Sequence, residues 1–419
     1  MIPRVKGTHD LLDMKFFNQL IALITKQLNR YHFAPVATPI LEPLELFKRT
    51  LGMHTDVVTK EMFVIETAAD EQDKICLRPE GTAPLMRAYL QDNVQEAPWK
   101  VFQCGPMFRH ERPQKGRFRQ FHQVTIEVMQ AASLMHDVEL ITMLDRFFDD
   151  VLHLDTYVLL INFLGCAADR QAYEIVLKKF LAKLPAGALC ANCQVRQEKN
   201  LLRIFDCKTP TCQQIYTKAP LVTDHLCAPC QIEWEQLQVA LRLLSVTYQH
   251  DPRLVRGLDY YTKTVFEFAS SNLGAQATFC AGGRYDGLAQ QLGSPNPVPA
   301  VGAAVGIERV LLLMLEQPDK WAMPPEEPLA VILPLSQQQI SLALILADTL
   351  RFAGIATEVL LETASIKSMM RTANKMAATW ALLLGEEEQQ TQTVTIKYMM
   401  NARQERVSQL DVVAHLKRN

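Results

Sequence analysis

The 419-residue sequence predicts a protein of two or three domains, in which strands and helices mix in the first part and an α/β domain of about 95 residues ends the chain. Three observations support this prediction. The chain is too long for one compact core. A long hairpin pattern occupies residues 101–129, and strand and helix patterns alternate after residue 329.

The hairpin pattern at residues 101–129 is the most informative stretch of the chain. Two β-compatible runs flank Pro113–Gly116, a break that is typical of a mobile turn. The stretch from residue 109 to residue 119 has one anion, Glu111, and five cations: Arg109, Arg112, Lys115, Arg117 and Arg119. Because five positive charges on one hairpin repel one another, the stretch predicts an anionic ligand between the strands. Phosphate is the anion whose oxygens best match the hydrogen-bond donors of arginine.

The return strand of this hairpin carries one polar face. Because side chains alternate along a strand, Arg117, Gln123 and Glu127 share this face with Arg119, Phe121 and Thr125. The face is interpreted either as a binding site or as a solvated outer face, and the hairpin alone does not decide between them.

The segments before the hairpin predict a helix at 16–31, an extended segment with three prolines, and a short helix at 44–50. Residues 75–82 predict a strand and a turn that opens a helix at 83–90. Glu80 and Thr82 stand at this helix start. They are interpreted either as helix caps, which is the simpler view, or as groups for a ligand ammonium.

The segments after the hairpin predict a helical stretch at 135–154 and strands at 157–163 and 253–268. They also predict a glycine-rich turn at 281–287 and a strand or turn that runs into a helix at 301–315.

Residues 165–250 are interpreted as an insertion, because they are helix-forming and carry six cysteines between residues 190 and 230. Three prolines make residues 317–327 a linker. Beyond it, strands at 330–333, 355–361, 380–384 and 394–399 alternate with helices at 337–352 and 365–376 before a final helix, which predicts a mostly parallel sheet.

The composition is that of an ordinary globular protein, with 48% hydrophobic residues, 21% charged residues and a net charge of −2. Any nucleic-acid partner must therefore meet local basic patches. The first residues lack the apolar segment of a secretory signal, and no apolar run reaches the roughly 18 residues of a membrane span. We expect a cytoplasmic protein without membrane contact, whose ten cysteines bind metal or are buried.

Five motifs follow one another along the sequence, at residues 38–62, 108–123, 254–268, 281–288 and 301–310. Together they make the sequence resemble the histidyl-tRNA synthetases, a family of class II aminoacyl-tRNA synthetases, over essentially its whole length. Residues 38–62, 108–123 and 301–310 are similar to the three class II motifs, of which the first builds the family's dimer interface. Residues 254–268 and 281–288 are similar to two elements that separate the histidine enzymes from other class II synthetases. The end of the chain resembles the family's anticodon-binding domain.

This resemblance implies the fold. It implies an α+β catalytic domain at residues 1–164 and 251–322, with a mixed, mostly antiparallel six-stranded sheet flanked by helices (the class II synthetase fold). It also implies a helical, cysteine-rich insertion at 165–250 and an α/β anticodon-binding domain at 323–419.

The resemblance further implies the reaction and its partners. L-Histidine and ATP, with Mg²⁺, form histidyl-adenylate, and the histidyl group then passes to tRNA(His) in a homodimeric enzyme. Arg109 would hold the α-phosphate, Arg309 the distal phosphates or the adenine, and Arg256 the scissile phosphate in place of a metal ion. Arg117 would also bind ATP, and Arg112 and Gln114 the acceptor end of tRNA.

The histidine pocket implied by the resemblance consists of Glu80, Thr82, Gln123, Glu127, Tyr260, Tyr261 and Tyr285. Glu127 and Tyr261 would bind the two imidazole nitrogens. The sequence departs from the family pattern at Gln130, where glycine is frequent, and at Met53 and His54.

The cysteine spacing in the insertion predicts a structural zinc site. Cys190 and Cys193 form one C-x2-C unit and Cys227 and Cys230 another, a pattern that suits tetrahedral Zn²⁺. Cys207 and Cys212 could replace either pair, and a set of reduced, partly buried thiols is the alternative.

Two other functions are alternatives to this prediction. One is a catalytically inactive regulatory subunit of histidine biosynthesis on the same fold, which would be expected to lack the C-terminal domain and the arginines. The other is a bare RNA-binding module, which would not need the Glu127 and Tyr261 pair.

Overall fold

The computed structural model describes residues 2–52, 55, 57–66, 74–185, 187–317, 319–321, 327–401 and 403–418. The chain forms two compact units, Met1–Met323 and Pro324–Asn419, and each is described by itself. Pro318, Pro324 and Pro325 of the expected linker lie outside the described residues, as do Met53 and His54.

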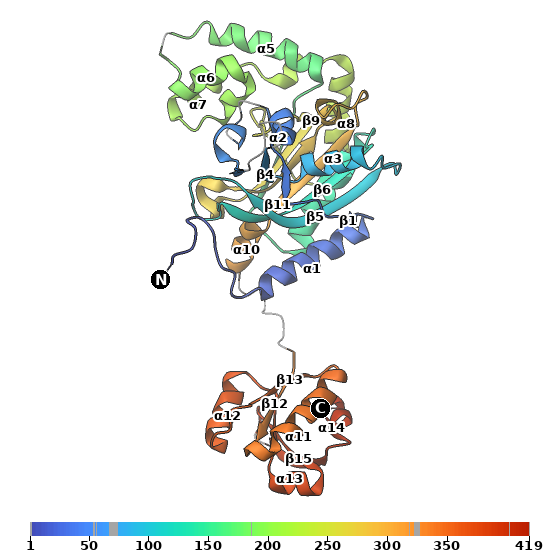
Figure 1. The fold of residues 1–419 in the computed structure, drawn as a ribbon. Coiled ribbons are helices and arrows are strands. Elements are labelled where there is room, and N and C mark those ends of the chain that lie inside the picture. The colour runs from blue at the N-terminus through green and yellow to red at the C-terminus, as the bar shows by residue number, and fades with distance from the viewer. Residues whose placement is uncertain are drawn as a thin grey trace. The chain divides into compact units, whose positions relative to one another are not determined.

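The first unit is built on one large sheet (Figure 1). Its strands are β1 (Ala34–Pro35), β5 (Trp99–Phe108), β6 (Gln120–Met129), β11 (Ala300–Gly306), β10 (Thr278–Arg284), β9 (Thr262–Ala269), β7 (Val158–Phe163) and β8 (Gln249–His250), in that spatial order. The expected number of six strands is therefore corrected to eight. The six long neighbours pair antiparallel, and the two-residue strands β1 and β8 add one parallel pairing at each edge.

The predicted hairpin is confirmed as β5 and β6, which pair from Trp99 opposite Met129 to Phe108 opposite Gln120. Val124, Ile126 and Val128 of β6 are buried in a core on one face of the sheet. Because side chains alternate, Gln123, Thr125 and Glu127 point to the opposite face. That face is not a solvated outer face, since Thr125 and Glu127 are fully buried.

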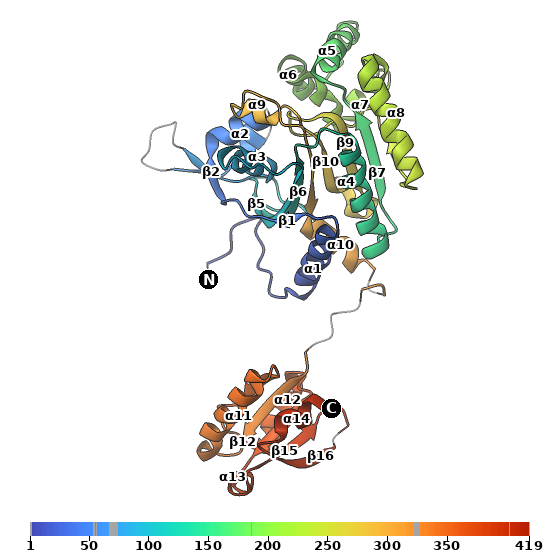
Figure 2. The same cartoon turned by 90° about the vertical axis from the view of Figure 1, so that its right-hand side faces the viewer.

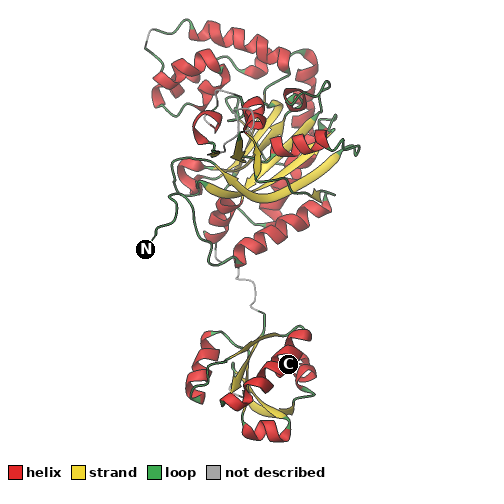
Figure 3. Cartoon of the chain, viewed as in Figure 1, coloured by secondary structure: helices red, strands yellow, loops and turns green. Residues whose placement is uncertain are grey.

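Helices pack on both faces of the sheet, as Figures 2 and 3 show. Buried residues of α1 (Lys15–Arg30), α4 (Met135–Arg146), α8 (Ala228–Leu243) and α10 (Ile307–Leu315) join the first core. Those of α2 (Leu44–Leu51), α3 (Thr82–Gln91) and α9 (Leu288–Gln291) join a second core, which also takes in the insertion helices α5 (Ala167–Leu181), α6 (Ala191–Lys199) and α7 (Pro210–Tyr216).

A small second sheet holds the segment with three prolines. Its strands are β2 (Leu41–Pro43), β4 (Ile75–Leu77) and β3 (Val64–Ile65), with β4 in the middle. The π-helical turn η1 (Val57–Glu61) precedes β3, and a second one, η3 (Phe147–Val151), continues α4. Short 3-10 turns, η4 (Leu201–Asp206), η5 (Val222–His225) and η6 (Ser271–Gln276), complete the unit.

The glycine-rich stretch at 281–287 is a correction, because most of it is not a turn but the end of β10. A Cβ on Gly282 would lie 2.2 Å from the carbonyl oxygen of Gly302 on β11, so the glycine permits close strand approach. Arg284 follows and is buried. It donates to both carboxylate oxygens of Asp137 and to the carbonyl oxygen of Ala131, which ties β10 to the start of α4.

The second unit has a five-stranded sheet in the order β13 (Ala356–Val359), β12 (Leu329–Pro334), β14 (Trp380–Leu384), β15 (Thr393–Tyr398) and β16 (Gln404–Ser408). The expected mostly parallel sheet is only half right. β12 pairs parallel with β13 and β14, but β15 and β16 add antiparallel. The helices are α11 (Ile340–Phe352) after the turn η7 (Gln337–Gln339), α12 (Ile366–Lys375), α13 (Glu386–Thr391) and α14 (Val412–Arg418). Among the described residues, none of the helices is long and apolar enough to cross a bilayer.

Candidate active site

A pocket with a cavity of about 280 Å³ opens on the polar face of β6. The hairpin, the start of α3, the loop before β9, and β10, β11 and α10 all contribute to its wall. Among the residues that line it are Glu80, Thr82, Arg109, Arg117, Gln123, Arg256, Tyr260, Tyr261 and Arg309. The fold therefore brings together four of the predicted phosphate-binding arginines and five of the predicted histidine-binding residues.

The four arginines are held by their surroundings and not by one another. Arg109 donates from Nε to the carbonyl oxygen of Pro79 at 2.8 Å, and its guanidinium lies over the ring of Phe121. Arg309 donates from Nε to the carbonyl oxygen of Gly116 at 2.9 Å, which connects α10 to the hairpin turn. Arg117 pairs with Glu111.

Burial and charge repulsion in this wall both disfavour the protonated form of Arg309. Burial, with the positive charges of Arg109 and Arg117, lowers the pKa of Arg309 to about 10. Burial also lowers the pKa of Arg109. A ligand with several negative charges would relieve both effects, since an opposite charge favours the protonated guanidinium.

Arg256 lies in the loop before β9. Its Nη1 pairs with Glu267 of β9, and its guanidinium carbon lies 5.8 Å from the ring centre of Tyr261. Its buried Nε has no hydrogen-bond partner among the described residues. The same holds for Oε1 of Gln123, which also faces the pocket. Buried polar atoms of this kind are unusual in a folded protein unless a ligand completes them.

Glu80 has the role of a helix cap and also lines the pocket. Its two carboxylate oxygens accept hydrogen bonds from the backbone N–H groups of Thr82 at 2.7 Å and Ala83 at 2.9 Å. The helix-cap interpretation is therefore confirmed. Burial raises the pKa of Glu80, although these N–H donors oppose the shift.

Glu127 does not line the pocket itself, but it forms a hydrogen bond with Thr82, which does. Its Oε1 accepts from the Thr82 hydroxyl at 2.6 Å, and its Oε2 accepts from the hydroxyl of Tyr285. Burial raises the pKa of Glu127 to about 8. Space for the carboxylate comes from Gly302 on the neighbouring strand, where a Cβ would lie 1.6 Å from Oε2.

Tyr260, Tyr261 and Tyr285 form a buried aromatic group next to Glu127. By contrast, Arg112 and Gln114 are exposed at the hairpin turn and do not line the pocket.

Three carboxylates of the pocket wall escaped the sequence reasoning as site residues: Glu111, Glu267 and Glu308. Glu308 accepts from the backbone N–H of His122 at 2.9 Å. Its place immediately before Arg309 was the available signal. Glu267 gave no such signal. The pairing of β9 and β10 brings it to the hydroxyl of Thr278, and the loop before β9 places Arg256 beside it.

Known proteins share this architecture along the whole chain. A family model described as histidyl-tRNA synthetase matches residues 7–310, and one described as anticodon binding domain matches residues 329–419. The chain belongs to the histidyl-tRNA synthetase family.

Individual members of the family agree with the model match. A histidine–tRNA ligase of Nitratidesulfovibrio vulgaris is 42% identical over 99% of this chain and 98% of its own length, and that of Aquifex aeolicus is 40% identical over 97% and 98%. The crystal structure of the apo histidyl-tRNA synthetase of S. aureus superposes with a TM-score of 0.82, at 30% identity and complete coverage of both chains.

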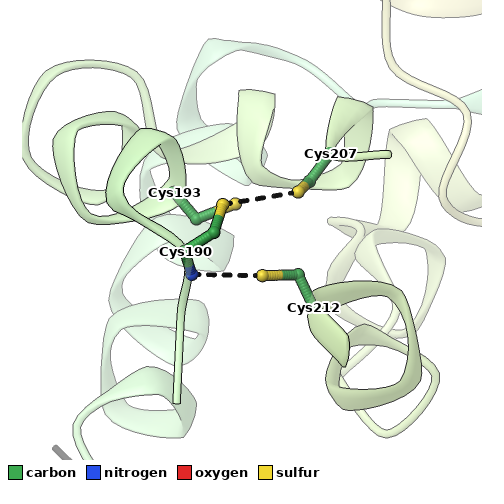
Figure 4. Close-up of side chains that lie close together, drawn as sticks. All are labelled: Cys190, Cys193, Cys207 and Cys212. Atoms are coloured by element: carbon green, nitrogen blue, oxygen red, sulfur yellow. Dashed lines mark hydrogen bonds between the residues drawn. The ribbon is translucent and has the colours of Figure 1, made fainter. Parts of the chain in front are cut away.

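In this member of the histidyl-tRNA synthetase family, the insertion cysteines form two groups. The ligand atoms of Cys190, Cys193, Cys207 and Cys212 lie within 4.8 Å of one another (Figure 4). Those of Cys166, Asp169, Cys227 and Cys230 form the second group.

The expected set of Cys190, Cys193, Cys227 and Cys230 is thus corrected, because the two C-x2-C units lie in different groups. The second C-x2-C pair, Cys227 and Cys230, lies at the start of α8 and faces the start of α5. There Asp169 accepts hydrogen bonds from the backbone N–H groups of Cys166 and Cys227. Cys166 was overlooked because it stands 24 residues before Cys190, far from any recognised spacing.

Proposed function

We propose that the pocket is the active site at which this chain, a histidine–tRNA ligase, activates L-histidine with ATP and then charges tRNA(His). The observation that carries this assignment is the wall itself. It combines four arginines for phosphates with the carboxylate of Glu80 and the unpaired oxygen of Gln123 for an ammonium group.

In the first step, a carboxylate oxygen of histidine attacks the α-phosphorus of ATP, and the bond to the bridging oxygen of pyrophosphate breaks. The protein positions the two reactants and balances the developing charge. We assign Arg109 and Arg256 to the α-phosphate, and Arg117 and Arg309 to the leaving phosphates. The Nε of Arg256 supports its role, since it offers a hydrogen bond that none of the described residues uses.

Histidine recognition rests on the groups behind and beside the arginines. Gln123 accepts a hydrogen bond from the ammonium group, which Glu80 and Thr82 also face. We assign Glu127, which is connected to the pocket through the hydroxyl of Thr82, and Tyr261 to the two imidazole nitrogens, and Tyr260 and Tyr285 to the surroundings of the ring. A pocket that pairs both nitrogens leaves its own polar groups unpaired with any other amino acid, so it discriminates by roughly 10⁴ or more.

In the second step, a ribose hydroxyl at the tRNA end attacks the histidyl carbonyl, and AMP leaves. We assign Arg112 and Gln114, at the exposed hairpin turn, to the acceptor end of tRNA. The second unit, which matches the anticodon-binding family, is assigned to the anticodon. A homodimer is part of this proposal, supported by the exposed apolar residues Ile40, Leu41 and Val64 around the small sheet.

The family uses ATP with Mg²⁺, but the pocket carboxylates do not form a group that would hold a metal. Glu111 and Glu267 pair with arginines and Glu308 with His122. We therefore assign no residue to Mg²⁺ and derive no step through it. We further propose structural Zn²⁺ in the insertion and, because all ten cysteines are free thiols, a reducing cytoplasm.

The decisive experiment is histidine-dependent exchange of labelled pyrophosphate into ATP, followed by charging of tRNA(His). Both activities are expected, with histidine strongly preferred over other amino acids. An inactive regulatory subunit would show neither activity, and an RNA-binding module would bind tRNA without exchange.

A further inference from the structure

The first cysteine group has the geometry of a tetrahedral metal site. Four Zn–S bonds of 2.3 Å place the sulfur atoms about 3.8 Å apart. The Sγ atoms of Cys190 and Cys207 are 3.7 Å apart. Figure 4 shows Cys190 and Cys193 at the start of α6, with Cys207 and Cys212 pointing toward them from two other segments. Cys193, Cys207 and Cys212 are almost fully buried, so solvent has little access to a bound ion.

Backbone donors already point at these sulfur atoms. The N–H of Cys190 donates to Sγ of Cys212 at 3.3 Å, and the N–H of Thr209 donates to Sγ of Cys207 at 3.4 Å. Such donors stabilise thiolates and orient them toward a metal. Four thiolates without an open position suit Zn²⁺ in a structural role.

The 3-10 turn η4 lies between two of these cysteines in the chain. Cys193 precedes it in α6, and Cys207 follows its last residue directly. Arg196 of α6 donates to the carbonyl oxygen of Arg203 at 3.0 Å, so α6 and η4 form one piece. An ion bound on both sides of η4 would hold this piece in place.

This piece contacts the loop that carries Arg256. Arg203 donates from Nη1 to the carbonyl oxygen of Gly257, the residue next to Arg256. Asn200, at the start of η4, donates from Nδ2 to Asp259 at 2.6 Å. A cavity of about 20 Å³ is lined by Asn200, Arg203 and Arg256 together, so Arg256 lies between the insertion and the active-site pocket.

We propose that Cys190, Cys193, Cys207 and Cys212 bind one structural Zn²⁺ ion, and that this ion, by holding η4, positions the Arg256 loop for histidine activation. Binding replaces the four S–H bonds with four Zn–S bonds and releases the four protons to solvent, and no oxidation state changes. The positioning role rests on the function proposed above, whereas the metal site does not. Arg203 and Asn200 are positioning residues, because they act through the loop and touch no substrate.

The first test measures metal in the full chain, purified under reducing conditions. Cys207→Ser/Cys212→Ser should lose one equivalent of zinc relative to wild type. Cys104→Ser removes an exposed cysteine outside both groups and should keep the full zinc content. Unchanged zinc in the double variant, or iron in place of zinc, overturns the site. If the double variant does not fold, a chelator that removes zinc from wild type, followed by zinc addition, makes the same comparison.

The second test measures the coupling. Loss of zinc should speed hydrogen exchange at residues 200–206 and 255–261 and leave the second unit unchanged. Arg203→Ala should keep its zinc but lower kcat of pyrophosphate exchange about 10- to 100-fold, the cost of a small misplacement, with KM for ATP within about threefold. Unchanged hydrogen exchange and kcat after zinc loss overturn the positioning role. If the wild-type protein shows no histidine-dependent pyrophosphate exchange, the proposed function is wrong. The metal content still tests the zinc site in that case.

Discussion

Glu127 illustrates how a single side chain is tuned by its position. It is fully buried, it accepts from two hydroxyl groups, and burial raises its pKa to about 8. The carboxyl group is therefore mostly neutral at pH 7 in the free protein. An imidazole N–H prefers the carboxylate, so histidine binding must favour ionisation of Glu127.

The first prediction follows from this linkage. Histidine affinity of wild type should increase as pH rises toward 8, by up to about tenfold per pH unit, and level off above. Glu127→Gln should lose this pH dependence and bind histidine more weakly at pH 9, by about 2–5 kcal/mol. Calorimetry measures the histidine affinity of both proteins at each pH. Because protonation of free histidine affects both proteins equally, the difference between their pH profiles reports on Glu127. Parallel pH profiles would show that Glu127 does not contact the substrate.

The second prediction concerns Arg256. Its removal should lower kcat for adenylate formation about 10²–10³-fold, because a preorganised donor acts mainly in the transition state. KM for histidine and ATP should change much less. Arg256→Lys should rescue poorly, since one ammonium cannot reproduce the guanidinium contacts. Pyrophosphate exchange of Arg256→Ala within about threefold of wild type would leave the arginine with a structural role only.

At the scale of elements, the pocket depends on how closely β6, β10 and β11 approach. Gly302 pairs with Glu127 across β6 and β11 and faces Gly283 of β10. Strand β11 therefore carries no side chain at the position that the buried carboxylate of Glu127 occupies. Gln130, directly after β6, adopts φ +58°, a left-handed conformation that glycine takes without strain.

The third prediction tests this space. A methyl group at position 302 would overlap Oε2 of Glu127 and lie 2.8 Å from the carbonyl oxygen of Ile126. Gly302→Ala should therefore destabilise the protein by about 1–3 kcal/mol and raise KM for histidine more than KM for ATP. Gly287→Ala, where the added methyl meets open space, serves as the control. Equal kinetics and stability of the two variants would refute the packing argument.

At the scale of the whole molecule, the two units have separate hydrophobic cores. Two clusters fill the first unit and two others the second. All residues that line the candidate active-site pocket belong to the first unit. Histidine activation and tRNA recognition should therefore be separable.

The fourth prediction is that a chain ending at residue 321 keeps pyrophosphate exchange within about tenfold of the full chain, provided that it folds and dimerises. Its tRNA charging should fall much further, because the anticodon contacts are lost. Circular dichroism and sedimentation check the fold and the oligomeric state. Equal losses in both assays, from a folded protein with an unchanged oligomeric state, would contradict this division of labour.

Local patterns were sufficient to predict the hairpin, the helix after Glu80 and most strands of the second unit. In these cases the alternation of side chains, the turn residues and the helix cap act within a few residues of one another. The motifs around Arg109, Arg256 and Arg309 were equally visible, because each is a continuous stretch. The sequence by itself thus determined the family and the reaction, and it predicted the arginines that line the pocket.

Contacts between distant segments decided the rest. The edge strands β1 and β8 have only two residues each and exist through pairing with β5 and β7. Glu267 reaches the hydroxyl of Thr278, and Glu127 loses contact with solvent, only when neighbouring strands assemble. Spacing identified the two C-x2-C pairs, but only tertiary packing determines which residues lie beside each pair. Cys207 and Cys212 lie beside Cys190 and Cys193, whereas Cys166 and Asp169 lie beside Cys227 and Cys230. Ligand sets and buried charges depend on three-dimensional proximity, which spacing along the chain does not encode.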